Sequence, residues 1–152
     1  LRLTQSLVGY YYRAVVSYID SHGTREVLYT SPSETIDNLD DPVQGEVTII
    51  GEPKEGVTLR ALSNSLSDED GIASISISWE TSKDGRNWIG VNSLSGPVLS
   101  LGQSLVGSQV RARVAVVDNF GIETNLYSQA TRTVENVNNK PSGRIVIRRV
   151  GQ

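Results

Sequence analysis

The amino-acid sequence predicts an all-β protein built as an antiparallel β-sandwich. Three observations support this fold class: short stretches of alternating apolar and polar residues, turn-forming residues at regular spacing, and no segment that keeps a helical period over three turns. The composition agrees, because the 152 residues include 14 glycines and many β-branched residues. With 38% hydrophobic and 20% charged residues, the chain has the composition of a folded globular protein.

An internal repeat indicates how the chain is organised. Residues 1–31 align without a gap on residues 99–129, at an offset of 98, and 14 of these 31 pairs are identical. The match weakens afterwards but continues, since the GEVTI of residues 45–49 corresponds to the GRIVI of residues 143–147. A period of about 98 residues is the size of one sandwich domain.

The repeat divides the chain into three parts. We interpret residues 45–140 as one complete unit, residues 1–44 as the C-terminal half of a preceding unit, and residues 141–152 as the first strand of a following unit. Because the chain begins with Leu1 rather than Met, we expect it to be a section of a longer protein. A two-stranded ribbon rarely builds a core by itself, so we expect residues 1–44 to be poorly ordered or completed by another copy.

Seven short segments of the complete unit have the pattern of strands. They are residues 46–50, 57–62, 74–79, 87–91, 97–101, 110–117 and 122–134. The third segment places Ile75, Ile77 and Trp79 on one face, with Trp79 at the centre of the core. The sixth turns Val110 and every second residue after it inward. Seven strands at this spacing predict an immunoglobulin-like sandwich, and a closed barrel is the alternative.

Several short motifs follow one another in order. They are GEVTI at 45–49, EGVTL at 55–59, SDEDGI at 67–72, SKDGRNW at 82–88, LVG at 105–107, VDNFG at 117–121 and VNNKPSG at 137–143. With these motifs the whole chain resembles the immunoglobulin-like and cadherin-like tandem repeats of large bacterial surface adhesins and related secreted proteins. The resemblance implies an extracellular, cell-surface array for adhesion or spacing. Its partners would be neighbouring repeats of the same chain and a cell-surface or matrix ligand.

An acidic turn before the third strand is a candidate calcium site. Asp68 and Asp70 stand two residues apart, directly before Gly71, and oxygen ligands at this spacing suit Ca²⁺. The sequence is no EF-hand, because the glycine comes too early and no Glu follows at the twelfth position. An acidic turn without a metal is the alternative, because Asp and Gly both favour turns for local reasons.

The resemblance adds candidate ligands at the junctions between units, because cadherin-like arrays often hold calcium there. The first linker carries Asp40 and Asp41, and Asp118 completes the set of candidate ligands. The second linker has Asn138 and Asn139 at the positions of the two linker aspartates. It should therefore attract a divalent cation less strongly than the first.

Several functional classes find no support in the composition. Without cysteine there is neither a disulfide nor a thiolate metal site, and the single histidine, His22, corresponds to Phe120 in the repeat. No set of nucleophile, base and orienting group emerges, so we expect no enzyme. The net charge of −3, without a basic stripe, indicates no nucleic-acid partner, and the lack of a long apolar run indicates no membrane insertion.

Two functions of different classes stay open. The first is a non-catalytic structural spacer in an array. The second is a carbohydrate- or ligand-binding β-sandwich module, for which Trp88 would supply an exposed stacking aromatic. We expect Trp88 to pack beside Trp79 across the hairpin instead, and Tyr12 to point inward while Tyr11 faces solvent.

Overall fold

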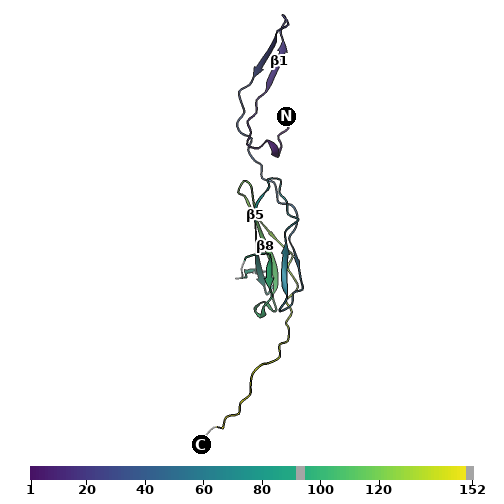
Figure 1. The fold of residues 1–152 in the computed structure, drawn as a ribbon, viewed down its shortest axis with the longest axis vertical. Coiled ribbons are helices and arrows are strands. Elements are labelled where there is room, and N and C mark those ends of the chain that lie inside the picture. Colours follow the sequence, from purple (N-terminus) through teal and green to yellow (C-terminus); the bar gives the residue numbers. More distant parts are fainter. Residues whose placement is uncertain (92–94, 150–152) are drawn as a thin grey trace.

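The computed structural model describes residues 1–91 and 95–149. The chain is elongated: a two-stranded hairpin stands at one end, two larger sheets follow, and an extended tail leaves at the other end (Figure 1). Apart from two single 3₁₀ turns, η1 (Gln5–Leu7) and η2 (Gln103–Leu105), the regular structure in these described ranges is antiparallel β-strand. The predicted all-β class is confirmed.

Two sheets make up the central part of the chain. One has three strands in the order β3-β4-β7 and the other has four in the order β6-β5-β8-β9. Their bounds are β3 (Thr48–Ile50), β4 (Thr58–Leu62), β5 (Ile72–Ser82), β6 (Ile89–Gly90), β7 (Val98–Ser100), β8 (Gln109–Asp118) and β9 (Glu123–Tyr127). Each overlaps one of the seven segments that the sequence predicts. The long β5–β8 pair is the centre of the larger sheet, running from Ile72 opposite Asp118 to Ser82 opposite Gln109.

The core lies between these sheets and follows the alternation of β8. Val110, Ala112, Val114 and Val116 are at most 1% exposed, while the residues between them are half-buried. Trp79 is buried as predicted, and its indole N–H donates a hydrogen bond to the Gly96 carbonyl at 3.0 Å. A buried indole needs such an acceptor.

The same face of β5 is less covered at its beginning. Ile75 lies opposite Val116, yet it is 40% exposed. The strands of the smaller sheet have at most five residues, whereas β5 has 11, so the smaller sheet covers only part of β5. Of the three predicted inward residues, Trp79 is therefore the one in the centre of the core.

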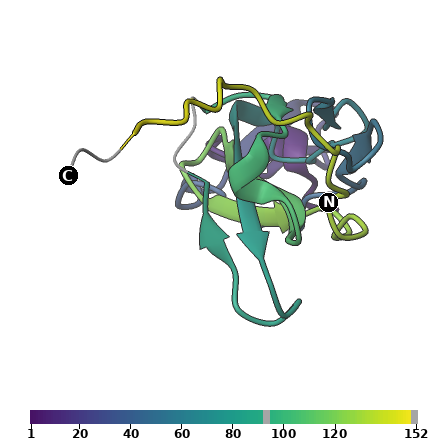
Figure 2. The same cartoon turned by 90° about the horizontal axis from the view of Figure 1, so that it is seen from below.

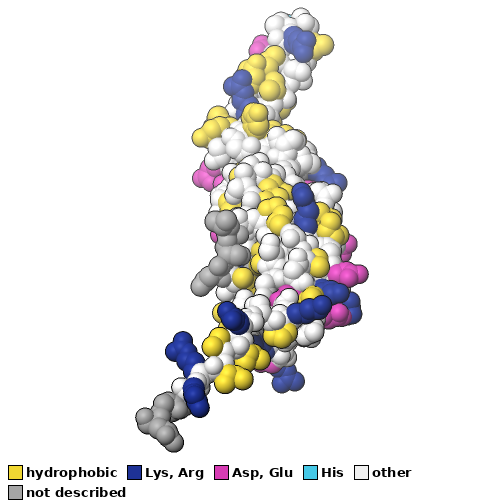
Figure 3. Space-filling view, turned by 60° about the horizontal axis from the view of Figure 1, so that its bottom comes forward, with side chains coloured by type: hydrophobic (Ala, Val, Ile, Leu, Met, Phe, Trp, Pro, Cys, Tyr) yellow, Lys and Arg dark blue, Asp and Glu magenta, His cyan; other side chains and the backbone are white. Residues whose placement is uncertain are grey.

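The hairpin of β1 (Val15–Ile19) and β2 (Arg25–Tyr29) has the local structure of β8–β9. Val15 lies opposite Tyr29 just as Arg113 lies opposite Tyr127, and η1 precedes it as η2 precedes β8. Its burial is different, because all ten strand residues are exposed. Hydrophobic side chains consequently lie on the surface of this hairpin, at the top of the space-filling view (Figure 3).

The chain leaves the sheets through a tightly held segment. Val134 is 1% exposed, and Glu135 forms a parallel bridge with Lys54. The Glu135 amide donates to the Pro53 carbonyl at 2.8 Å, and the Glu55 amide donates to the Glu135 carbonyl at 2.9 Å. Beyond it, residues 141–149 run away from the sheets without strand partners (Figures 1 and 2). A first strand needs a neighbour to pair with, so its formation by residues 141–152 stays a prediction.

Candidate metal centre

Three aspartates meet at the end of the two sheets that faces the hairpin. Asp40 comes from the linker after the hairpin, Asp70 from the turn before β5, and Asp118 from the end of β8. One carboxylate oxygen of each lies within 4.8 Å of the corresponding oxygens of the other two. Asp40 is exposed, whereas Asp70 and Asp118 are each only 4% exposed. The cluster therefore joins the linker to the unit that follows it.

Asp118 is fixed in place by its own turn. Its Oδ1 accepts hydrogen bonds from the backbone amides of Phe120 and Ile122, both at 2.8 Å. Its Oδ2 is buried and has no hydrogen-bond partner in the described part of the chain. A buried carboxylate oxygen without a partner is costly and uncommon. This oxygen is the atom of Asp118 that remains available to a cation.

Asp70 holds the junction together through both of its oxygens. The Gln5 side-chain amide donates to Oδ1 at 2.7 Å, and the Asp41 backbone amide donates to Oδ2 at 3.0 Å. Both donors precede the central unit in the chain, so Asp70 connects that unit to the hairpin and to the linker. Carboxylates accept such bonds more strongly than neutral groups do.

The turn that carries Asp70 is closely packed. Gly71 has a φ of +80°, and a Cβ at this position would collide with the side-chain amide of Asn119, the neighbour of Asp118. A non-glycine residue would be strained at this φ and would displace the Asn119 side chain. Gly71 therefore allows the Asp70 turn to approach the Asp118 turn closely.

The pKa of Asp40 is affected by the other carboxylates around it. Partial loss of hydration raises the pKa of its carboxyl group, and repulsion from Asp118, Asp70, Asp68 and Asp41 raises it further. The ionised form of Asp40 is thus disfavoured by its neighbours. A bound cation would remove this penalty, because it would turn the repulsion among the carboxylates into shared attraction.

The donor set fits a hard divalent cation. Three carboxylates supply oxygen ligands, and neither histidine nor cysteine belongs to the cluster. Ca²⁺ takes six to eight oxygens in flexible geometry, whereas Mg²⁺ demands a nearly ideal octahedron. Ligands from a linker and two separate turns suit the flexible geometry of Ca²⁺ better than the strict octahedron of Mg²⁺. Backbone carbonyls and water would complete the coordination sphere.

The structure gathers three of the five predicted ligands and gives the other two different roles. Asp40, Asp70 and Asp118 form the cluster. The Asp68 Oδ1 instead accepts a hydrogen bond from the Asp70 amide, at 2.8 Å, which stabilises the turn. Asp41 contributes its backbone amide to Asp70. For Asp68 the structure therefore shows the alternative interpretation of the sequence, an acidic turn. An Asp side chain readily accepts a hydrogen bond from the amide two residues further along the chain.

Gln5 is the functional residue that the motif analysis missed. Its side-chain amide donates both to the side-chain Oδ1 of Asn38, at 2.9 Å, and to Asp70. The repeat held the signal, since Gln5 and Asn38 are identical to Gln103 and Asn136. The Gln103 amide likewise donates to the Asn136 oxygen, at 3.4 Å. The amide pair is thus repeated, whereas the contact of Gln5 with Asp70 belongs to the first copy among the described residues.

Trp88 lies on the outer face of the larger sheet. The Arg111 guanidinium stacks over its ring at 4.3 Å and over the Tyr127 ring at the same distance. Arg111 also pairs with Glu80 at 2.7 Å. Trp88 is therefore half-buried against Arg111, on the face opposite that of the buried Trp79. The expected packing of the two tryptophans side by side is not what the structure shows.

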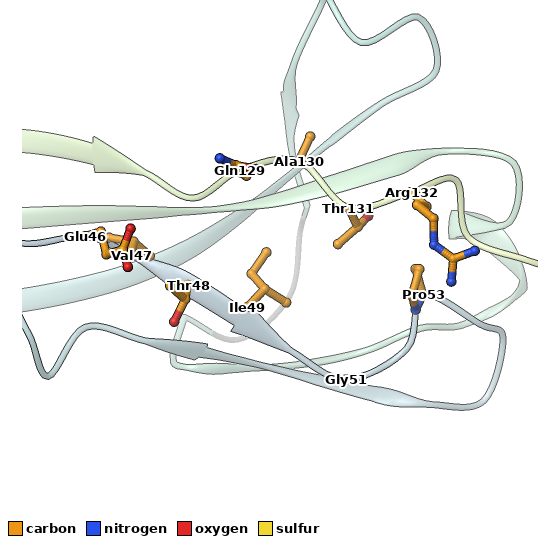
Figure 4. Close-up of a pocket in the computed structure, with 10 residues that line it drawn as sticks. All are labelled: Glu46, Val47, Thr48, Ile49, Gly51, Pro53, Gln129, Ala130, Thr131 and Arg132. Carbon is orange, nitrogen blue, oxygen red and sulfur yellow. The ribbon is translucent and has the colours of Figure 1, made fainter.

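A separate cleft of about 390 Å³ opens along one side of the sandwich-like part. Residues 46–49 line one wall, residues 129–132 line the other, and Arg132 extends over Pro53 at one end (Figure 4). The ionisable groups in its lining are Glu46 and Arg132, and the lining includes no histidine, serine or cysteine. The hydroxyl groups of the lining are those of Thr48 and Thr131.

No protein-family model matches the chain, and no curated protein is significantly similar to it. Across the described residues, no helix has the length and apolar character needed to cross a membrane.

Proposed function

We propose that this chain is a non-catalytic section of an extracellular array of immunoglobulin-like β units, which acts as a structural spacer with calcium at its junctions. The observation that carries the proposal is the buried, unpartnered Oδ2 of Asp118 beside Asp40 and Asp70. A carboxylate cluster on a solvated surface is common without a metal. A buried carboxylate oxygen that lacks a hydrogen-bond donor instead indicates a cationic ligand.

The position of the cluster explains what calcium would do. Asp40 belongs to the linker, while Asp70 and Asp118 belong to the following unit. A cation bound to all three fixes the linker on that unit, next to the Gln5–Asp70 hydrogen bond. Units joined by such a junction keep a constant direction along the array, as a spacer requires. The alternative of a carbohydrate-binding module gains no support from Trp88, whose ring is stacked with Arg111.

Thermal unfolding in Ca²⁺ and in chelator tests the metal. A ligand that binds only the folded protein stabilises it by about 2.7 kcal/mol at a hundredfold excess over Kd. For a unit of this size, that corresponds to a rise in Tm of roughly 10–20 °C. Equal midpoints with and without Ca²⁺, and no heat on titration, would contradict the proposed site.

A matched pair of variants separates the site from its turn. Asp118→Asn keeps an oxygen for the Phe120 and Ile122 amides but replaces the unpartnered oxygen by an amide. It should abolish the calcium shift and raise Tm in chelator, because the repulsion within the cluster falls. The control is Asp20→Asn, since Asp20 accepts the corresponding bonds from His22 and Thr24 at 2.9 and 2.8 Å but lies outside the cluster. Equal effects of both variants would assign Asp118 a purely structural role.

The spacer role has its own measurement. The chain has no cysteine, so spin labels at Glu34→Cys and Lys83→Cys report one distance across the junction. Both positions are exposed. Calcium should narrow the distribution of this distance, and Asp118→Asn should prevent the narrowing. A distribution that stays broad in saturating Ca²⁺ would refute the proposed stiffening while leaving calcium binding itself intact.

A further inference from the structure

The hairpin β1–β2 presents an apolar face that nothing in the described chain covers. Val16 and Tyr18 are 53% and 48% exposed. Their equivalents on β8, Val114 and Val116, are at most 1% exposed. A contiguous apolar face of this kind marks an interaction surface.

The edge of β1 lacks a strand that its counterpart has. β8 pairs with β9 on one side and with β5 on the other, whereas β1 pairs with β2 alone. The backbone groups along the other edge of β1 are thus available to one more antiparallel strand. The complete unit shows which strand fills this place, because β5 occupies the corresponding edge of β8.

Arg13 carries the third sign of an absent partner. Its guanidinium stacks over Tyr29 at 4.3 Å, as Arg111 stacks over Tyr127. Arg111 has in addition Trp88 on its other side and Glu80 as an ion-pair partner. Trp88 and Glu80 come from the β5–β6 region. Within the described ranges, Arg13 has neither a second aromatic ring nor a carboxylate at ion-pair distance.

A second copy of this chain is a poor candidate for the partner. Its residues 45–98 already cover its own β8 and β9, so donating them would expose as much apolar surface as it would hide. A segment joined to Leu1 has no such cost. Its connection is also direct, since residue 98 precedes Leu99, and Leu99 is the equivalent of Leu1.

We infer that β1–β2 is the docking half of a β-sandwich whose other half is a segment built like residues 45–98 and joined to Leu1 in the array. This inference rests on the tandem-array part of the proposed function. The partner supplies a β5-like strand to the free edge of β1, and an acidic residue and an aromatic ring to Arg13. Tyr12 and Tyr18 replace Val110 and Val116, so the partner leaves more room at these two places than residues 45–98 do.

The test extends the chain by a second copy of residues 45–98, fused directly before Leu1. Amide hydrogen exchange is measured in chelator, which makes the result independent of calcium. The Val15–Ile19 amides should exchange at least ~100-fold more slowly than in the 152-residue chain. A second extended protein carries Tyr12→Val and Tyr18→Val, which restores the side chains that residues 45–98 normally cover. In whichever extended protein shows protection, Arg13→Ala should reduce it.

Each outcome decides for or against the docking surface. Protection of β1 in either extended protein supports it, and loss of that protection with Arg13→Ala supports the Arg13 contacts. Unchanged exchange in both extended proteins would overturn it. The docking surface would also be refuted if the β1 amides of the unextended chain became better protected from exchange as the protein concentration rises. A second copy of the chain would then cover the face. None of these results depends on the calcium titration of the central unit.

Discussion

The two hairpins β1–β2 and β8–β9 have the same local structure and opposite environments. Both follow a 3₁₀ turn, both share one register, and both end in an aspartate-capped turn. Yet Val114 is fully buried, whereas its equivalent Val16 is 53% exposed. The alternation of residues therefore specifies a strand with two unlike faces, and the strands packed on it decide whether the apolar face is buried.

The largest effect should follow from Trp79→Ala, which removes the centre of the buried region. Truncating a large core side chain costs about 3–5 kcal/mol, an appreciable part of the stability of a small domain. Chemical denaturation followed by tryptophan fluorescence measures the loss. A variant that melts within a few degrees of the parent would show that Trp79 is not central.

The comparison is sharpened by the pair Val114→Ala and Val16→Ala. The substitution is identical, but only Val114 is buried. Val114→Ala should lower the free energy of unfolding by about 2 kcal/mol through lost burial and a small cavity. Val16→Ala should change it by less than about 0.5 kcal/mol, as most surface substitutions do. Similar costs for both variants would mean that the face of β1 is covered in solution.

A smaller difference in stability is expected between Arg111→Ala and Arg13→Ala, which alter stacked arginines of the two hairpins. Arg111→Ala removes an ion pair with Glu80 and two stacked rings, all partly exposed. Its cost should be about 1 kcal/mol, whereas Arg13→Ala, with one exposed ring, should cost no more than a few tenths. Urea unfolding of the two variants at low and high salt checks both values. The salt dependence should appear in the Arg111 variant alone.

The smallest effect on stability is expected for Asp84→Ala, in the turn after β5, and it should depend on pH. Hydrogen bonds from the Asn87 and Arg86 backbone amides, together with the Asn87 and Ser82 side chains, hold the pKa of Asp84 well below its usual 3.8. A lowered carboxyl pKa stabilises the folded state above the unfolded-state pKa, and this contribution declines as pH falls below it. The difference in Tm between the parent and Asp84→Ala should therefore shrink below about pH 4. A constant difference from pH 7 to pH 3 would assign the effect to geometry rather than charge.

The sequence was sufficient for the strands but not for the burial of each side chain. The alternation around Val114 predicted which residues of β8 face the core, because the period of a strand is two. It failed for Ile75, whose exposure depends on the length of the opposing sheet. It also placed Trp88 beside Trp79, since strand spacing alone does not show that the ring stacks on Arg111 across the outer face.

The sequence predicted which residues form the candidate site, but not how their atoms are arranged. Acidic residues before Gly71 and in the linker indicated oxygen ligands, and all three members of the cluster were among those predicted. The sequence could not show that Asp68 bonds its own turn, or that Asp41 acts through its backbone. Such roles depend on φ and ψ at single residues, and the contact between Gln5 and Asp70 depends on how η1 lies against the turn before β5.

The parallel bridge between Lys54 and Glu135 has a mechanical consequence. A pull on the C-terminal tail first loads the hydrogen bond from the Val137 amide to the Glu55 side chain, and then Glu135, whose backbone is bonded to Pro53 and Glu55. The buried Val134 just behind Glu135 must leave the core before β9 can peel away. Under tension the exit segment therefore resists separation from the loop between β3 and β4, and we expect these contacts to slow forced unfolding.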